Sequence, residues 1–292
     1  MLVRYRNETW RRVTHARTGQ RRPVTWRGAG WALRRRTSTH FAFVGSQRRG
    51  STGSPPTLQL LGPPRLHLDG VWRELPLTRW VLLLAHVART GTWVRREALA
   101  AMFWPDHDKD RANWNLRQTL RTIARSQAAT AFEREPTRVR WIGACDVTTF
   151  EAHARAQDWR QVVGAYGGPF VDGLEEIQAT PAQEWLTFER SSLTDRWRTG
   201  VLALAEQRLD AGSALDALDL ADRLIACDPF DETAVRLVMR AAVAADDRHR
   251  AARVYRSLRT LLYEEFGTEP EPATAALANT HGIFLGERDG GA

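Results

Sequence analysis

The chain has little cysteine and no long apolar segment. Its two cysteines, Cys145 and Cys227, lie far apart, without the spacing of a metal knuckle or a redox pair. We interpret both as small buried apolar residues of a protein in a reducing, cytoplasmic compartment. The longest apolar run, Trp80 to Ala88 broken by His86, is shorter than the roughly 20 residues that cross a membrane. No apolar run precedes a cleavage site near the N-terminus either, so we expect neither a membrane span nor a secretory signal.

The usual sequence signatures of catalysis and cofactor binding are also missing. There is no GxxxxGK[ST] phosphate loop, no GxGxxG turn, no HExxH and no GxSxG. His107 stands among Asp106, Asp108 and Asp110, but an acidic loop before a helix is better explained by helix capping than by a metal site. We therefore expect no enzyme, no catalytic residue, no cofactor and no metal.

Positive charge is abundant but unevenly placed. The formal net charge is +8, yet residues 1–56 alone hold thirteen arginines against a single acid, Glu8, and the remainder has 29 basic and 33 acidic residues. We interpret residues 1–56 as a disordered Arg-rich tail, because nothing periodic in it buries apolar surface. It is either a basic arm with non-specific phosphate affinity or the product of a misassigned translation start. Any specific nucleic-acid contact of the folded part must come from local clusters of charge.

Residues 57–143 predict a winged helix-turn-helix domain. Short alternating segments with turns at Gly62 and Asp69-Gly70 indicate a small antiparallel sheet. Three helices are then expected, over residues 77–90, 95–103 and 110–126. A final pair of strands turns at Glu135-Pro136 and forms the wing.

The rest of the chain, residues 146–285, is Ala-rich and predicts a tetratricopeptide-like, all-helical domain. The residues that indicate a repeat of 34 are Ala217, Ala221, Leu224 and Pro229, followed by Ala251, Tyr255, Leu258 and Tyr263. An ordinary helical bundle with coincidental spacing is the alternative. The expected fold class is thus mostly α with a small β part, in two domains.

The predicted helix 110–126 carries two different surfaces. Apolar residues line one face, namely Ala112, Leu116, Leu120 and Ile123. The outward side has no acid from residue 112 to residue 126, whereas a solvated helix face usually mixes both signs of charge. We predict base contacts in a DNA major groove for Asn113, Arg117, Gln118 and Arg121, and phosphate contacts for Arg95, Arg96, Arg125, Arg134, Arg138 and Arg140. Trp114 either packs within the domain, against Trp104, which we favour, or lies on the sugar-phosphate backbone.

Three phrases resemble the SARP-type bacterial transcriptional activators, the antibiotic regulatory proteins. They are Trp104-Pro105-Asp106, Asn115-Leu116-Arg117 and Phe266-Gly267-Thr268-Glu269-Pro270, and the likeness covers about residues 57–285. The resemblance implies an OmpR-like winged helix that binds direct repeats near promoters. It also implies a tetratricopeptide-like bacterial transcriptional activator domain, used for dimerisation or for helping to recruit RNA polymerase. The chain departs from the family at Thr122 to Arg125, where Leu-Arg is usual, and its wing lacks a Gly-Tyr end.

The sequence therefore predicts a cytoplasmic regulator of transcription, most simply an activator, that binds double-stranded DNA. RNA polymerase and a second copy of the chain are its expected protein partners. Two other classes stay open. One is a helical-repeat scaffold for protein interactions without specific DNA binding, and the other is an RNA-binding factor indicated by the Arg-rich tail alone.

Overall fold

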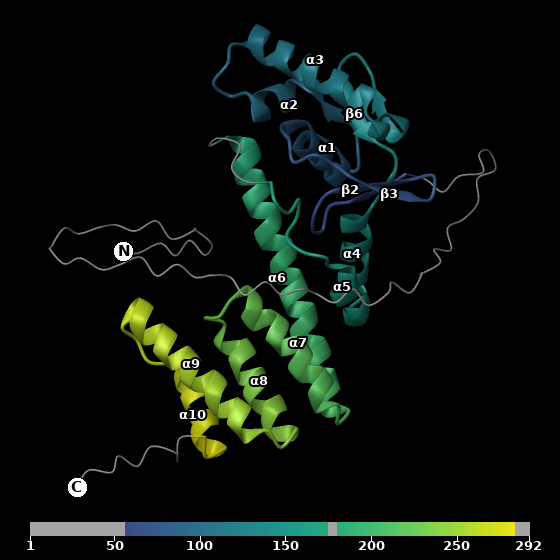
Figure 1. Ribbon diagram of the computed structural model, residues 1–292. Coiled ribbons are helices and arrows are strands. Elements are labelled where there is room, and N and C mark those ends of the chain that lie inside the picture. The colour runs from purple at the N-terminus through teal and green to yellow at the C-terminus, as the bar shows by residue number, and fades with distance from the viewer. Residues whose placement is uncertain (1–55, 175–179, 284–292) are drawn as a thin grey trace, which may run out of the picture. The chain divides into compact units, whose positions relative to one another are not determined.

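The structure of the protein is a computed structural model that describes residues 56–174 and 180–283 (Figure 1). The interpretation of residues 1–56 as a tail falls outside the described residues, apart from Pro56. The described part belongs to one compact unit, Ser54–Ala292. It is mostly helical with two small sheets, which confirms the predicted fold class.

The N-terminal half has the element order of a winged helix. Its elements are β1 (Thr57–Gln59), β2 (Arg65–Leu68), β3 (Val71–Glu74), α1 (Arg79–Thr90), β4 (Val94–Arg95), α2 (Arg96–Phe103), α3 (Lys109–Arg125), a short 3₁₀ helix (Gln127–Ala131), β5 (Phe132–Arg134), β6 (Arg138–Trp141) and β7 (Ala144–Cys145). One sheet has the strand order β3-β2-β1-β7 and the other β4-β6-β5. The expected antiparallel pairing holds for β1, β2 and β3, but β7 runs parallel to β1. The returning chain after the wing thus extends the first sheet.

Local signals set the ends of the helices as the sequence predicted, within two residues. The backbone of Thr78 is extended, so α1 begins at Arg79, and Gly91 ends it in the left-handed conformation, with φ of 70°. The Asp108 carboxylate accepts a hydrogen bond of 2.9 Å from the backbone N–H of Arg111. Asp108 is therefore the N-cap of α3, which confirms the capping interpretation of the acidic loop.

The C-terminal half consists of helices. They are α4 (Asp146–Arg155), α5 (Trp159–Ala165), α6 (Pro181–Asp210), α7 (Ala214–Cys227), α8 (Glu232–Ala244), α9 (Arg248–Phe266) and α10 (Pro272–Thr280). The repeat positions that the sequence predicted as small or large apolar residues are buried, and they are Ala217, Ala221, Leu224, Ala251, Tyr255 and Leu258. Helices α7, α8 and α9 pack in succession, as in an array of paired helices.

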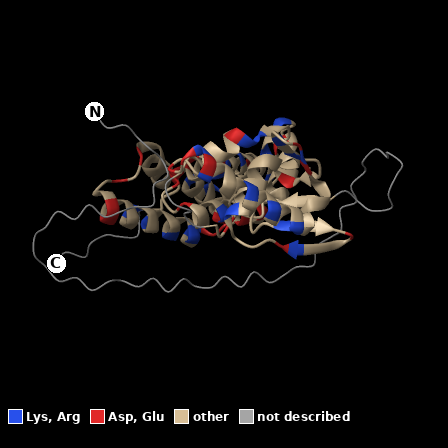
Figure 2. Cartoon of the chain, turned by 90° about the horizontal axis from the view of Figure 1, so that it is seen from above, with Lys and Arg blue, Asp and Glu red and all other residues tan. Residues whose placement is uncertain are grey.

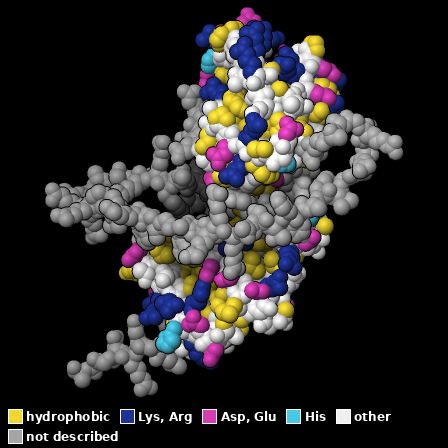
Figure 3. All heavy atoms as spheres, turned by 45° about the vertical axis from the view of Figure 1, so that its right-hand side comes forward, with side chains coloured by type: hydrophobic (Ala, Val, Ile, Leu, Met, Phe, Trp, Pro, Cys, Tyr) yellow, Lys and Arg dark blue, Asp and Glu magenta, His cyan; other side chains and the backbone are white. Residues whose placement is uncertain are grey.

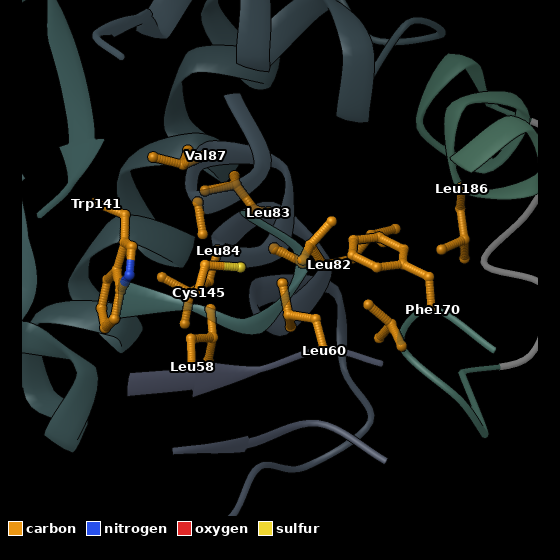
Figure 4. Packing of buried hydrophobic residues seen from close by; sticks show 14 of the residues in the cluster. Leu58, Leu60, Leu82, Leu83, Leu84, Val87, Trp141, Cys145, Phe170 and Leu186 are labelled. Carbon is orange, nitrogen blue, oxygen red and sulfur yellow. The ribbon is translucent and has the colours of Figure 1, made fainter. Parts of the chain in front are cut away.

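The buried apolar residues form two clusters. The larger one extends from β1 through α1 and α3 to α6, and Figure 4 shows part of it, with Leu58 and Leu60 beneath α1 and Phe170 beside Leu186. The smaller one joins the C-terminal part of α6 to α7, α8, α9 and α10. Apolar packing thus crosses the boundary predicted near residue 145. Cys145 is buried as expected, but Cys227 is exposed, because it is the last residue of α7, next to the turn at Asp228-Pro229.

Candidate nucleic-acid interface

Helix α3 buries one face and presents a polar stripe on the other. Ala112, Leu116, Leu120 and Ile123 are the buried residues, as the spacing predicted. Residues three and four positions apart lie above one another on a helix. The outward stripe with this spacing consists of Arg111, Trp114, Gln118, Arg121 and Arg125. Figure 3 shows Lys and Arg side chains gathered at the top of the molecule, the end where Figure 1 shows α3.

The four residues predicted to contact bases differ in exposure. Arg117 and Arg121 are exposed, whereas Asn113 and Gln118 are half-buried. The Gln118 side-chain oxygen lies 3.5 Å from the Arg121 guanidinium. Gln118 also lines an open cavity of about 510 Å³ between α3 and the start of α1. Arg121 and Gln118 are therefore held side by side, and Asn113 and Arg117 form a row on the flank of the stripe.

Trp114 corrects the sequence analysis. Its side chain is 46% exposed and does not pack into the domain against Trp104, which is buried. The guanidinium of Arg111 lies over the Trp114 ring, 5.0 Å from its centroid. Since α3 directs Trp114 away from the core, both residues join the polar stripe. Sequence reasoning missed Arg111 as a candidate, although it stands three residues before Trp114, one turn earlier on the same face.

In the wing hairpin of β5 and β6, two of the arginines predicted to bind phosphates are paired with glutamates. Arg138 donates to Glu135 at 2.6 Å and Arg140 donates to Glu133 at 2.6 Å. The hydrogen bond between Arg138 and Glu135 raises the pKa of the guanidinium and lowers that of the carboxyl. Both guanidinium groups also lie 4.5 Å from the centroid of the Trp93 ring. This packing fixes the two arginines but leaves each with an acid beside it.

Arg96 and Arg134 form the clearest candidate for an anion site. Arg96 begins α2 and Arg134 ends β5, and burial, followed by the charge of Arg134, lowers the pKa of Arg96. Among the described residues, the buried Nε of Arg96 has no hydrogen-bond partner, and Arg134 has no acid within ion-pair distance. Two neighbouring cations without an acid between them favour a phosphate oxygen at this position. Arg95 and Arg125 are exposed on β4 and at the end of α3.

Within residues 56–174 and 180–283, no three residues from the set His, Cys, Asp and Glu are grouped in a way that would hold a metal ion. Over the same ranges, no helix has the length and apolar content required to cross a membrane.

Comparison with known protein families identifies the helical half. Residues 145–280 match the family model of the bacterial transcriptional activator domain. The helical half is therefore similar to these domains, which favours regulators of transcription over enzymes. Among solved structures, the chain is similar to Mycobacterium tuberculosis EmbR, from a complex with a low-affinity phosphopeptide, at 20% sequence identity and a TM-score of 0.56.

The likeness to EmbR concerns the fold. It covers 78% of this chain and 65% of the EmbR chain, so this chain spans about two thirds of that protein's length or slightly less. A search of curated proteins finds no match.

Proposed function

We propose that the protein is a sequence-specific DNA-binding regulator of transcription, and more specifically an activator. The single observation that carries this proposal is the outward side of α3, which has no acid from Ala112 to Arg125 and lies in a winged-helix order of elements. In this geometry the second helix of a helix-turn-helix enters the major groove, and the helix before it braces the contact. Here α3 is the reading helix and α2 the bracing one.

The residues divide into two roles under this proposal. Arg117 and Arg121 have the reach and geometry for bidentate contacts with guanine, and Asn113 and Gln118 have the amides that pair with adenine. Each such pair discriminates against a wrong base by about 1–3 kcal/mol. Phosphates are bound by the residues around them, which are Arg95, Arg96, Arg125, Arg134, Arg138 and Arg140. Among these, the pair of Arg96 and Arg134 has the strongest support, since no acid of the described residues compensates it.

The helical half supplies the regulatory contacts in this proposal. Residues 57–143 form the DNA-binding domain and residues 146–285 the activator domain, whose match to bacterial transcriptional activator domains supports recruitment of RNA polymerase or dimerisation. The protein then acts in the cytoplasm on direct repeats near promoters. Direct repeats require protomers in tandem, whereas a two-fold dimer requires a palindrome.

The test uses duplex DNA selected by the full chain from a random library of about 30 base pairs, three turns of duplex. We expect Arg117→Ala and Arg121→Ala to weaken binding of the selected sequence by about tenfold or more each. Arg160→Ala is the matched control, because Arg160 is exposed on α5 far along the chain from α3. Fluorescence anisotropy at several salt concentrations gives the affinity and the number of phosphates contacted.

The selection itself distinguishes the alternatives. Failure to enrich any sequence, together with unchanged affinity of both variants, would exclude specific reading by α3. A DNA affinity that does not depend on salt, together with a protein partner that stays bound through purification, would instead favour a scaffold for protein interactions.

A further inference from the structure

Helix α9 concentrates positive charge along its first three turns. Its sequence, RHRAARVYRSLRTLLYEEF, places all its arginines before residue 260 and its acids, Glu264 and Glu265, at the C-terminal end. Figure 2 shows the blue segments recurring along this helix, at the left of the view, with red at its end. The helix is therefore polarised in charge along its length, with the positive end at its N-terminus.

Two of the five arginines of α9 are paired with acids within the fold. Arg250 pairs with Asp222 on α7, and Arg259 pairs with Glu269 at 3.0 Å. Arg248 donates to the backbone carbonyl of His281 at 3.1 Å. Arg253 and Arg256 have no acid within ion-pair distance among the described residues, and both are exposed.

An open groove of about 620 Å³ runs along the same side of α9. Its lining includes Arg256, Arg259, Tyr263, Glu264, Glu269 and Ile283. The ring of Tyr263 is 67% exposed, which is unusual for a large aromatic side chain. The groove thus combines cations and acids with hydroxyl groups and apolar surface.

The position of α9 in the array of helices explains why this side is open. Its buried residues, Ala251, Tyr255, Leu258 and Leu262, belong to the cluster shared with α8. In an array of paired helices, the next helix would cover the other side of α9. Among the described helices, α8 is the one that packs extensively against α9, since the short α10 packs against α8 instead. None of the helices within residues 56–174 and 180–283 covers the groove.

We propose that this groove binds an acidic peptide segment of a partner protein, with an apolar side chain against Tyr263 and Ile283. Arg256 in the lining and Arg253, one turn before it on α9, supply the uncompensated positive charge. Opposite charges across an interface speed and orient binding. Glu264 and Glu269 also line the groove and would repel any acidic group placed beside them. The acidic residues of the peptide therefore lie at Arg253 and Arg256, and its apolar residue lies beside Tyr263 and Glu264. A continuous phosphate backbone would have to pass both acids, which makes a nucleic acid a poorer fit. This inference concerns a surface separate from α3 and does not depend on DNA reading.

The experiment uses the full chain and fluorescein-labelled peptides of about 12 residues, built from Asp and Glu with one Leu or Phe. The matched peptides replace Asp and Glu by Asn and Gln. We expect the acidic peptides to bind and the amide peptides not to bind. Arg253→Glu combined with Arg256→Glu should weaken binding by about tenfold or more, while Arg160→Glu should leave it unchanged.

Tyr263→Ala is a second variant that preserves the charge of the groove. It should weaken binding of the peptides with Leu or Phe about threefold or more, because the side chain that contacts the apolar residue is lost. Circular dichroism and thermal unfolding check that each variant is folded.

Equal affinity of the acidic peptides for the wild type and the double arginine variant would overturn the proposal. Peptide binding that requires removal of residues 284–292 would instead assign the groove to the chain's own C-terminus. A change of oligomeric state in the double variant, without peptide binding, would assign it to a second copy. Loss of random-sequence DNA affinity, again without peptide binding, would assign it to nucleic acid.

Discussion

The Nε of Arg89 on α1 lies 2.9 Å from Oε2 of Glu189 on α6, a residue 100 positions further along the chain. The other side of the same guanidinium donates to both carboxylate oxygens of Glu151 on α4, at 2.8 and 3.2 Å. Burial lowers the pKa of Arg89, but the hydrogen bonds and charges of the two glutamates outweigh it and raise the pKa overall. One arginine thus ties the winged helix to the helical half.

Replacing Arg89 by Met should destabilise the fold by about 1–3 kcal/mol. The carboxylates of Glu151 and Glu189 are only 15% and 12% exposed, so they would lose their cation while remaining largely out of water. The expected loss of stability is smaller than the loss on breaking a fully buried ion pair, because the Arg89 side chain is 24% exposed and Arg196 still binds Glu151. Urea denaturation of the full chain measures the loss.

Arg65→Met is the control for this prediction. Arg65 pairs with Glu74 across β2 and β3, but the two side chains are 39% and 80% exposed. An exposed ion pair contributes about 0–1 kcal/mol. Equal losses in the two variants would mean that the contact between α1, α4 and α6 is no stronger than a surface pair.

The features of the fold that could be predicted from the sequence are those set by local signals. The buried face of α3 follows from the spacing of Ala112 and Leu116, and the end of α1 from Gly91. The parallel pairing of β7 with β1 joins Cys145 to Leu58, and no local pattern indicates a pair of that separation. The Arg89 contacts were unpredictable for the same reason.

Part of the wing could have been predicted better than it was. The turn predicted at Glu135-Pro136 sets Glu133 opposite Arg138, whereas the turn in the structure is centred one residue later and sets Glu133 opposite Arg140. Opposite charges at facing positions of a hairpin pair with each other. The sequence therefore indicated that Glu133 compensates a wing arginine, but the exact turn decides which one. The exposure of Trp114, in contrast, depends on how α3 packs on the rest of the domain.

The wing arginines should differ in their effect on DNA binding. Arg134→Gln removes a cation without an acid beside it, so we expect the slope of log affinity against log salt to fall by about 1. Arg138→Gln removes a cation that Glu135 already neutralises, so the slope should change less. Anisotropy titrations at four or five salt concentrations measure both slopes. A larger effect of Arg138→Gln would show that Glu135 releases its partner on the DNA.

Trp114→Ala should weaken binding of the selected DNA about threefold or more without lowering the stability of the protein by more than about 1 kcal/mol. The ring is nearly half exposed and contacts the Arg111 guanidinium, so its loss removes a contact surface of α3 and frees Arg111. Trp72→Ala is a matched control, since Trp72 is 49% exposed on β3, away from α3. A large loss of thermal stability in Trp114→Ala, with unchanged DNA affinity, would show that this tryptophan is structural.

Asp146 predicts a dependence of stability on pH. Burial raises the pKa of its carboxyl from 3.8 to about 6, although the backbone N–H groups of Leu60 and Leu61 donate to the carboxylate at 2.9 Å. A carboxyl group whose pKa is raised by folding keeps its proton up to a higher pH in the folded state than in the unfolded state. Its contribution to the free energy of unfolding is therefore largest below about pH 4 and falls as pH rises through 6.

Asp146→Asn removes this titration while preserving the size of the side chain. The free energy of unfolding of the variant, minus that of the wild type, should therefore rise by about 2 kcal/mol between pH 4 and pH 7. Asp216→Asn is the matched control, because it makes the same change on a side chain that is 62% exposed. A difference that stays constant or falls with pH would mean that the two backbone N–H groups outweigh burial and hold Asp146 ionised throughout.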